Sequence, residues 1–224
     1  MSVYMTEEEQ LESIKNWWKQ YGNVITICVS LVLLTVAGFR YMHWHQDKLT
    51  QQASTTYEKM MYEYSNHNIK AVRSYANQLI NDYDRSIYAD VAHMTLAKIY
   101  ITKSKPSSAK VELQAVVNRR KMVALKQIAK LRIARILASE KSYNNALQEL
   151  SYVEDNAYLP LINELKGDIY GAQGQYKEAI SAYHLAMDEV KSNGMANLFL
   201  EMKTNELTSK SEVKGTVVEK VQSV

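Results

Sequence analysis

Histidine is the side chain in this sequence best suited to metal binding or to acid–base chemistry near neutral pH. Five histidines are present, and two of them, His43 and His45, lie on either side of Trp44. The other three are scattered, with no acidic or thiol cluster at ligand spacing. We therefore expect no metal centre, and His43 with His45 is the one alternative of that kind.

No motif of an established enzyme class accompanies the histidines. The sequence lacks glycine-rich phosphate loops, the HExxH zinc motif and the GxSxG serine elbow. Its 7 glycines are too few to build a phosphate cradle. The single cysteine, Cys28, excludes an intramolecular disulfide and a multi-cysteine zinc site. We therefore expect a protein that is not an enzyme and that uses no cofactor.

A run of basic residues between positions 119 and 135 contains no acidic residue. It comprises Arg119, Arg120, Lys121, Lys126, Lys130, Arg132 and Arg135. On a helix these charges do not share one face, so the plainest interpretation is a solvated surface. Contact with anionic lipid headgroups or with an acidic protein are the alternatives. Nucleic acid is not expected, because no aromatic residues interleave the charges and the net charge is only +3.

One apolar segment near the N-terminus contains no charged residue over positions 20–39. As a helix, these 20 residues span about 30 Å, the thickness of the hydrocarbon core of a bilayer. Trp17, Trp18, Tyr21, Tyr41 and Trp44 flank it, and such rings favour the membrane interface. We predict an uncleaved transmembrane helix over 20–41. A buried core helix and a cleaved signal peptide are the alternatives, and the flanking basic residues do not orient the segment.

The segments around this span have a different character. Residues 1–19 form a short amphipathic segment, whose predicted helix start is a capping box of Thr6 and Glu9. We expect a linker over 42–51, a helical domain over 52–207 and a flexible tail over 208–224. With 7 glycines and 2 prolines, the chain has too little turn punctuation for a β-sandwich or barrel. The predicted fold class is therefore all-α.

Residues 52–207 repeat a helical pattern. The clearest unit places small and aromatic residues at Gly167, Tyr170, Gly174, Tyr176, Ala179, Tyr183 and Ala186. This spacing resembles the tetratricopeptide repeat, and related positions recur 33 or 37 residues earlier. We predict helix pairs over 52–83, 88–118, 124–156 and 160–191. A final amphipathic helix would bury Met195, Leu198, Phe199 and Met202.

The chain as a whole resembles one bacterial family. The resemblance rests on an acidic-then-tryptophan start over residues 4–22, with Glu7-Glu8-Glu9 and Trp17-Trp18, and on the single span that follows. It continues through Tyr57-Glu58, Tyr88-Ala89 and the repeats to Leu200-Glu201-Met202-Lys203. On these residues the chain resembles the YfgM-type ancillary subunits of the SecYEG translocon, over about residues 4–207.

This resemblance implies more than the residues themselves indicate. It implies an inner-membrane protein with a cytoplasmic N-terminus and a periplasmic repeat domain. The implied partners are the SecYEG translocon, a membrane-anchored periplasmic chaperone of the prolyl-isomerase type, and unfolded client polypeptides in transfer between them. A membrane-tethered repeat scaffold for another envelope assembly complex is the alternative.

Partner-binding residues follow by analogy with the groove of tetratricopeptide repeats. The first helix of each pair faces that groove, which selects Leu131 and Arg135 in the third pair. In the fourth pair it selects Glu164 and Asp168. We predict these four residues as the partner-binding surface, with ordinary solvated side chains as the alternative.

Overall fold

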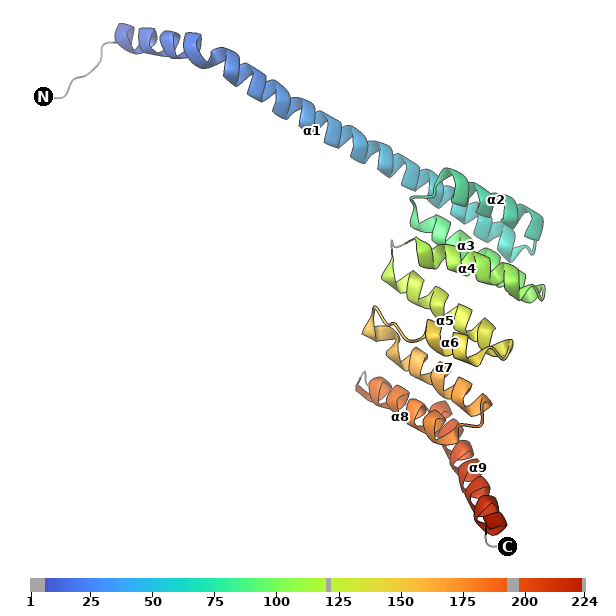
Figure 1. Cartoon of the computed structure of the whole chain (residues 1–224). Coiled ribbons are helices and arrows are strands. Elements are labelled where there is room, and N and C mark those ends of the chain that lie inside the picture. The colour runs from blue at the N-terminus through green and yellow to red at the C-terminus, as the bar shows by residue number, and fades with distance from the viewer. Residues whose placement is uncertain (1–6, 120–121, 193–197, 223–224) are drawn as a thin grey trace, which may run out of the picture. The chain divides into compact units, whose positions relative to one another are not determined.

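The computed structural model describes residues 7–119, 122–192 and 198–222, and all regular structure in them is helical (Figure 1). The predicted all-α fold class is confirmed. The helices are α1 (Glu7–Ser65), α2 (Ile69–Asp82), α3 (Ile87–Thr102), α4 (Pro106–Asn118), α5 (Val123–Ser139), α6 (Tyr143–Glu149), α7 (Leu159–Ala172), α8 (Tyr176–Ser192) and α9 (Leu198–Gln222), with a short 3-10 helix η1 (Asn156–Tyr158) before α7. The chain divides into two compact units, residues 1–52 and 53–224.

The first unit is the N-terminal part of α1, which is long and apolar enough to cross a membrane. Over residues 23–39 its side chains are exposed around the whole helix, apart from half-buried Ile25. Leu34, for example, is 73% exposed. Within the described residues this segment is therefore not the core helix of a soluble domain. The capping box predicted at Thr6 lies outside the described residues.

The residues predicted to be a linker, 42–51, are helical and belong to α1. They contain neither glycine nor proline, so nothing in them interrupts the backbone ladder. The hydroxyl of Thr50 donates to the carbonyl of Gln46 at 2.9 Å, as expected inside a continuous helix. Polar residues such as these are compatible with a solvated helix, and α1 continues through them without a break.

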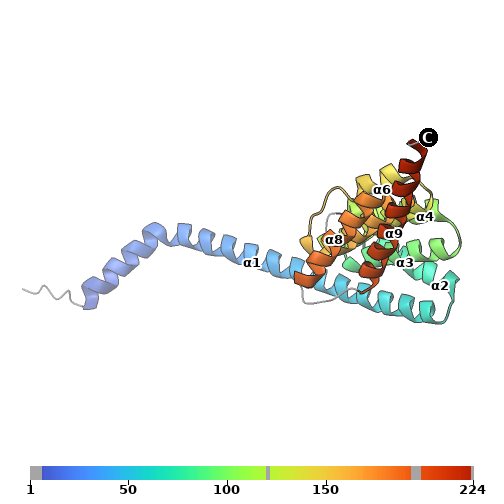
Figure 2. The ribbon, with the colours of Figure 1, turned by 90° about the horizontal axis from the view of Figure 1, so that it is seen from below.

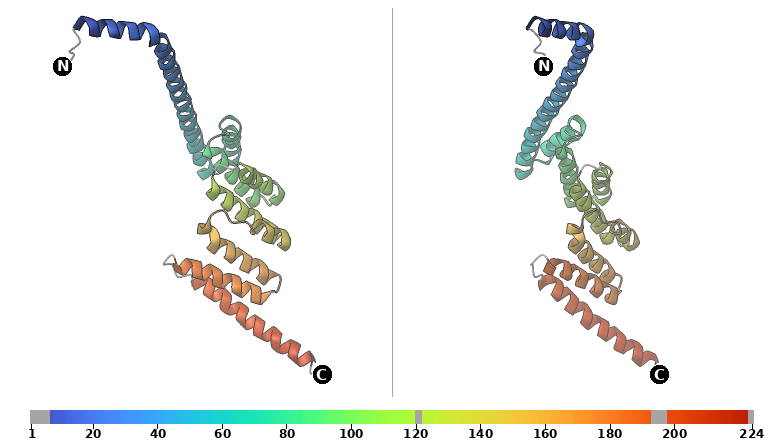
Figure 3. Two further views of the ribbon diagram at one scale, coloured as in Figure 1. Left: turned by 60° about the vertical axis from the view of Figure 1, so that its left-hand side comes forward. Right: turned by 90° about the vertical axis from the view of Figure 1, so that its left-hand side faces the viewer.

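The second unit is a stack of helix pairs (Figure 1), which overlap when seen from below (Figure 2). Residues 53–65 of α1 pack against α2, and the further pairs are α3 with α4, α5 with α6, and α7 with α8. Successive pairs lie side by side in chain order, as the views in Figure 3 agree. Because no pair can bury its apolar face alone, the stacking creates the core. It consists of four clusters along the stack.

The turns inside the four pairs share one geometry. His67, Ser104, Lys141 and Gly174 each lie two residues before the second helix and have φ angles of 59°, 54°, 61° and 74°. The amide that follows each of them donates to a carbonyl five residues earlier, at 2.8–3.0 Å. This is the Schellman motif, which ends a helix through one residue in the left-handed region. The turns follow at intervals of 37, 37 and 33 residues and so define the repeat register.

The repeat alanines and one glycine set how closely paired helices approach. Ala109, Ala146 and Ala179 are fully buried, as small residues between closely packed helices are expected to be. A Cβ atom placed on Gly167 of α7 would lie 2.4 Å from the ring of Tyr183 on α8. No such distance is tolerated, so Gly167 lets the Tyr183 ring lie against the α7 backbone.

The third pair is shorter than the predicted range of 124–156, because α6 ends at Glu149. The side chain of Asp155 accepts a hydrogen bond from the amide of Ala157 at 3.0 Å and starts η1 instead. Short polar side chains compete with helix in this way.

The last helix, α9, buries a different face from the predicted one. Leu200 and Thr204 are buried and Leu207 is partly buried, whereas Leu198, Phe199 and Met202 are each more than half exposed. Met195 lies outside the described residues. Thr204 can be buried although it is polar, because its hydroxyl donates to the carbonyl of Leu200 at 2.8 Å and is satisfied within the helix.

The predicted flexible tail is also helical as far as Gln222, as a continuation of α9. Lys210 and Glu206, four residues apart, pair at 2.5 Å. Such pairs support an exposed helix modestly, and composition alone did not distinguish this helix from a polar tail.

Candidate partner-binding surfaces

The basic run separates into two groups in the structure. The residues of the first group form ion pairs or a ring contact with other residues of the chain. Arg119 forms an ion pair with buried Asp90 at 2.5 Å, and Lys126 pairs with Glu154. Lys130 lies over the ring of Tyr152, 5.1 Å from its centroid. These cations hold the fold together. Arg120 and Lys121 lie outside the described residues.

The second group, Arg132 and Arg135, lines a groove of about 330 Å³ together with Lys98. Three helices contribute to this groove: α3, α4 and α5. Its apolar lining consists of Ala97, Ile101, Leu113 and Ile136. Since α4 packs against both α3 and α5, its Leu113 lies between the two first helices. The groove thus combines an apolar lining with three cations.

No carboxylate among the described residues pairs with Arg132 or Arg135. Nearby acids have other partners: Glu112 contacts His93 at 2.7 Å and Glu140 contacts Lys110 at 2.7 Å. Burial lowers the pKa of Arg132, and the charge of Arg135 lowers it further. The groove therefore holds like charges that nothing in the described chain neutralises.

The predicted partner-binding residues fall into three different environments. Arg135 is exposed in the groove, whereas Leu131 is only 4% exposed and belongs to the core. Leu131 therefore does not face a partner, because its side chain fills the space between pairs. Glu164 and Asp168 are bound by a residue of the same chain, Lys203 of α9. The sequence analysis missed this contact, since Lys203 lies 39 and 35 residues along the chain from Glu164 and Asp168.

Lys203 connects the last helix to the fourth pair. Its ammonium donates to Asp168 at 2.7 Å and to Glu164 at 3.1 Å. Burial alone would lower the pKa of Lys203, but these two hydrogen bonds raise it above its usual value. Burial also raises the pKa of Tyr183, as does the hydrogen bond that its hydroxyl donates to Asp168 at 2.7 Å. The two acidic side chains of the fourth pair, Glu164 and Asp168, are thus already bound by a lysine of the same chain.

Sequence analysis also missed Lys98, although the repeat register contains the signal that finds it. Moving back by the 37-residue interval from Arg135 gives Lys98, and moving forward by 33 gives Asp168. Lys98, Arg135 and Asp168 are therefore equivalent positions in successive pairs. The first two carry positive charge and the third carries negative charge.

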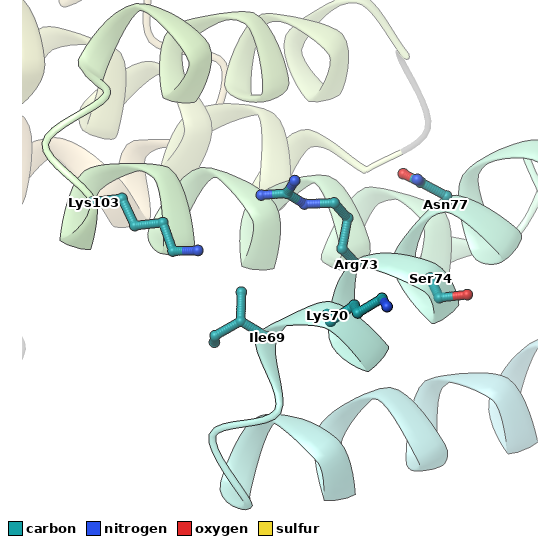
Figure 4. Close-up of a pocket in the computed structure, with 6 residues that line it drawn as sticks. All are labelled: Ile69, Lys70, Arg73, Ser74, Asn77 and Lys103. Carbon is teal, nitrogen blue, oxygen red and sulfur yellow. The ribbon is translucent and has the colours of Figure 1, made fainter.

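A second cavity, of about 390 Å³, lies on α2 (Figure 4). Lys70, Arg73 and Lys103 line it, together with Ile69, Ser74 and Asn77. Figure 4 shows Arg73 extending toward the neighbouring helices, and its guanidinium lies over the ring of Tyr100 at 5.7 Å. This cavity is basic, but unlike the groove it has only one apolar side chain in its lining.

The histidines of the described residues form no cluster of the kind that binds a metal ion. No group of three or more His, Cys, Asp or Glu side chains that could hold a metal ion occurs in the part of the chain that the structure describes. The ring of His45 stacks on Tyr41 with 6.3 Å between centroids. His93 lies beside Glu112 and links α3 to α4.

Stacked helix pairs with Schellman turns and a final packed helix define the class of helical-repeat proteins. A family model described as "Tetratricopeptide repeat-like domain" matches residues 15–209. The chain belongs to this family.

Comparison with individual proteins gives relatives of nearly the same extent. An "Ancillary SecYEG translocon subunit" of Aggregatibacter actinomycetemcomitans is 26% identical over 92% of this chain and the whole of the relative. Proteins of the same name from Neisseria gonorrhoeae and Escherichia coli are 25% and 23% identical, over 92% and 93% of this chain and the whole of each relative. The resemblance indicated by the sequence is confirmed.

Proposed function

We propose that this chain is a membrane-anchored, non-catalytic adaptor of the Sec translocon that passes translocated polypeptides to periplasmic chaperones. The observation that carries the proposal is the match to ancillary SecYEG translocon subunits over their whole length. Such a match includes both the apolar part of α1 and the repeat domain. The chain therefore shares its whole architecture with these relatives, and not only one domain.

The anchor is supported by the exposure of α1. A helix that is apolar all round is stable only inside a large core or in a bilayer. Tyr21 and Tyr41 lie 20 residues apart along α1, about 30 Å on a helix, which matches the hydrocarbon thickness. Each has a tryptophan beside it, with ring centroids 6.0 Å apart for Trp17 and Tyr21 and 6.1 Å apart for Tyr41 and Trp44. This pattern fits two aromatic belts at the membrane surfaces.

Tethering explains how such a protein works without high affinity. A binding surface held beside a channel exit meets its client at an effective concentration that reaches the millimolar range. Weak binding with rapid release is then sufficient, and rapid release is what a transfer step needs. In this proposal the N-terminus is cytoplasmic, the repeat domain is periplasmic, and the receiving partner is a membrane-anchored chaperone of the prolyl-isomerase type.

The test is co-purification of the tagged full-length chain with the translocon in mild detergent. The control is a chimera in which an unrelated single span replaces residues 20–41, so that expression and membrane targeting are matched. We expect the translocon to be recovered with the full-length chain. Its consistent absence, with both partners well expressed, contradicts the proposal.

A protease experiment on spheroplasts tests the proposed topology. We expect the repeat domain to be degraded from outside while the inner membrane is intact. Survival of the domain until the membrane is lysed places it in the cytoplasm and contradicts the periplasmic role. Crosslinking that repeatedly recovers another envelope complex and not the translocon favours the alternative scaffold.

A further inference from the structure

In the fourth helix pair, the charged position on the first helix is neutralised by the helix that stacks next to it. Asp168 and Glu164 of α7 hold the ammonium of Lys203, which α9 brings alongside. Leu200, next to Lys203 on α9, is buried in the same contact. The helix α9 thus packs on the fourth pair through Leu200, Thr204 and Leu207, and its Lys203 supplies a charge opposite to that of Asp168 and Glu164.

The same position in the two preceding pairs is positively charged, and the helix that stacks next offers it no paired carboxylate among the described residues. Lys98 and Arg135 replace Asp168 in the repeat register, and Arg132 adds a third cation one helical turn before Arg135. Lys98 lies 5.4 Å from the ring centroid of Tyr64, and none of the three forms an ion pair with a carboxylate among the described residues. Charge complementarity at this site therefore requires negative groups.

The apolar lining narrows the chemistry of the partner further. Ile101 is 45% exposed at the groove, beside Ala97 and Ile136. The volume of about 330 Å³ is at the lower end of the range for ligand sites, which suits a few side chains better than a pair of acyl chains. Guanidinium groups bind carboxylates through two parallel hydrogen bonds.

We propose that the groove between α3 and α5 binds an acidic segment of another protein, with an apolar side chain placed on Ile101 and flanking carboxylates on Lys98, Arg132 and Arg135. The inference rests on the repeat domain alone and does not depend on the association with the translocon. Failure of either proposal therefore leaves the other in place.

The test uses the full-length chain in nanodiscs of phosphatidylcholine and a fluorescent peptide in which leucine alternates with glutamate. Two matched peptides carry lysine in place of glutamate, or serine in place of leucine. We expect fluorescence anisotropy to detect binding of the first peptide only, with affinity falling as salt is added. Equal binding of all three peptides, or none, contradicts the proposal.

Variants locate the binding site on the chain. Arg132→Glu with Arg135→Glu should weaken binding of the acidic peptide by about tenfold or more, because two attractions become repulsions. The matched control, Lys70→Glu with Lys103→Glu, makes the same change in net charge at the cavity on α2 and should alter affinity less than about twofold. Equal effects of the two double variants mean that only net charge matters, which overturns the assignment.

Milder variants keep the test informative if the double reversal fails to fold. Arg135→Gln removes one exposed charge and Ile101→Ala shortens the apolar contact. Each should weaken peptide binding while leaving the circular dichroism spectrum unchanged. Vesicles of phosphatidylglycerol provide the last arm: binding to them that depends on Arg132 and Arg135, without peptide binding, identifies a lipid site and overturns the proposal.

Discussion

At the scale of single residues, the closest approach in the stack is between α7 and α8. Gly167 has no side chain, and the ring of Tyr183 occupies the position where a Cβ would be, 2.4 Å away. Because Tyr183 is itself 4% exposed and donates to Asp168, its ring cannot move aside without breaking that hydrogen bond. Gly171, one turn further along α7, has only ordinary neighbours at 3.5 Å or more.

These two glycines give a matched pair of substitutions. Gly167→Ala should destabilise the repeat domain by about 1–3 kcal/mol, the usual cost of overpacking. Gly171→Ala should be neutral or stabilise by up to about 1 kcal/mol, because alanine is the better helix former. Thermal unfolding of the full chain in mild detergent measures both. Equal effects of the two substitutions contradict the packing role of Gly167.

The Lys203 contacts predict a response to alkaline pH. The pKa values of Lys203 and Tyr183 are both raised in the folded chain, so the folded state binds these protons more tightly than the unfolded state. Their stabilisation is complete below the unfolded values of about 10 and is lost as the pH rises above them. We expect the melting temperature difference between the native chain and the double variant Lys203→Met with Tyr183→Phe to be constant at neutral pH and to shrink above about pH 10. A difference that grows with alkaline pH would show the opposite linkage.

At the scale of elements, the Schellman turns explain why α-helices alternate in direction so regularly. Three of the four left-handed positions hold residues other than glycine: His67, Ser104 and Lys141. A side chain in this region costs about 1–2 kcal/mol per residue, and only the α7–α8 turn avoids that cost, with Gly174. The four turns have the same geometry because the same backbone hydrogen bonds form in each of them.

Replacing one of these residues tests the turn directly. Lys141→Gly should stabilise the domain by about 0.5–1 kcal/mol, since strain is removed while the unfolded chain gains some freedom. Lys141→Ala removes the same side chain but keeps the strain, and should bring no such gain. Comparison of the two melting temperatures decides whether the backbone or the lysine side chain matters.

Each element also differs in how well local sequence specified it. The helix pairs follow from apolar periodicity, and their ends agree with the predicted ranges to within a few residues, except at the end of the third pair. The face of α9 does not follow, because Leu200, Thr204 and Leu207 are selected by α7 and α8 and not by their own hydrophobicity. In the groove, Arg135 was predicted from its repeat position and the repeat register also gives Lys98, while Ile101 required knowledge of which helices flank the cavity.

At the scale of the whole molecule, one segment determines where the chain resides. If residues 20–41 span a bilayer, a charge at the centre of that segment costs about 2.5–3.5 kcal/mol. Val29→Arg with Leu33→Arg should therefore release much of the protein into the soluble fraction on alkaline carbonate extraction. The control, Ser107→Arg with Val111→Arg, places the same two charges four residues apart on exposed positions of α4 and should leave the protein in the membrane. Retention of both variants contradicts the anchor.

The sequence by itself determined the uncharged apolar segment, the number of helix pairs and the repeat intervals, because these depend on residues close together in the chain. Only the tertiary structure decided which charges remain available. Arg119 and Lys126 are neutralised by Asp90 and Glu154, both more than 25 residues away, and Glu164 and Asp168 by Lys203, 35 or more residues away. Ion pairs over such separations form only when the stack brings the helices together, so no local pattern records them. The same long-range packing leaves Lys98, Arg132 and Arg135 together at one groove.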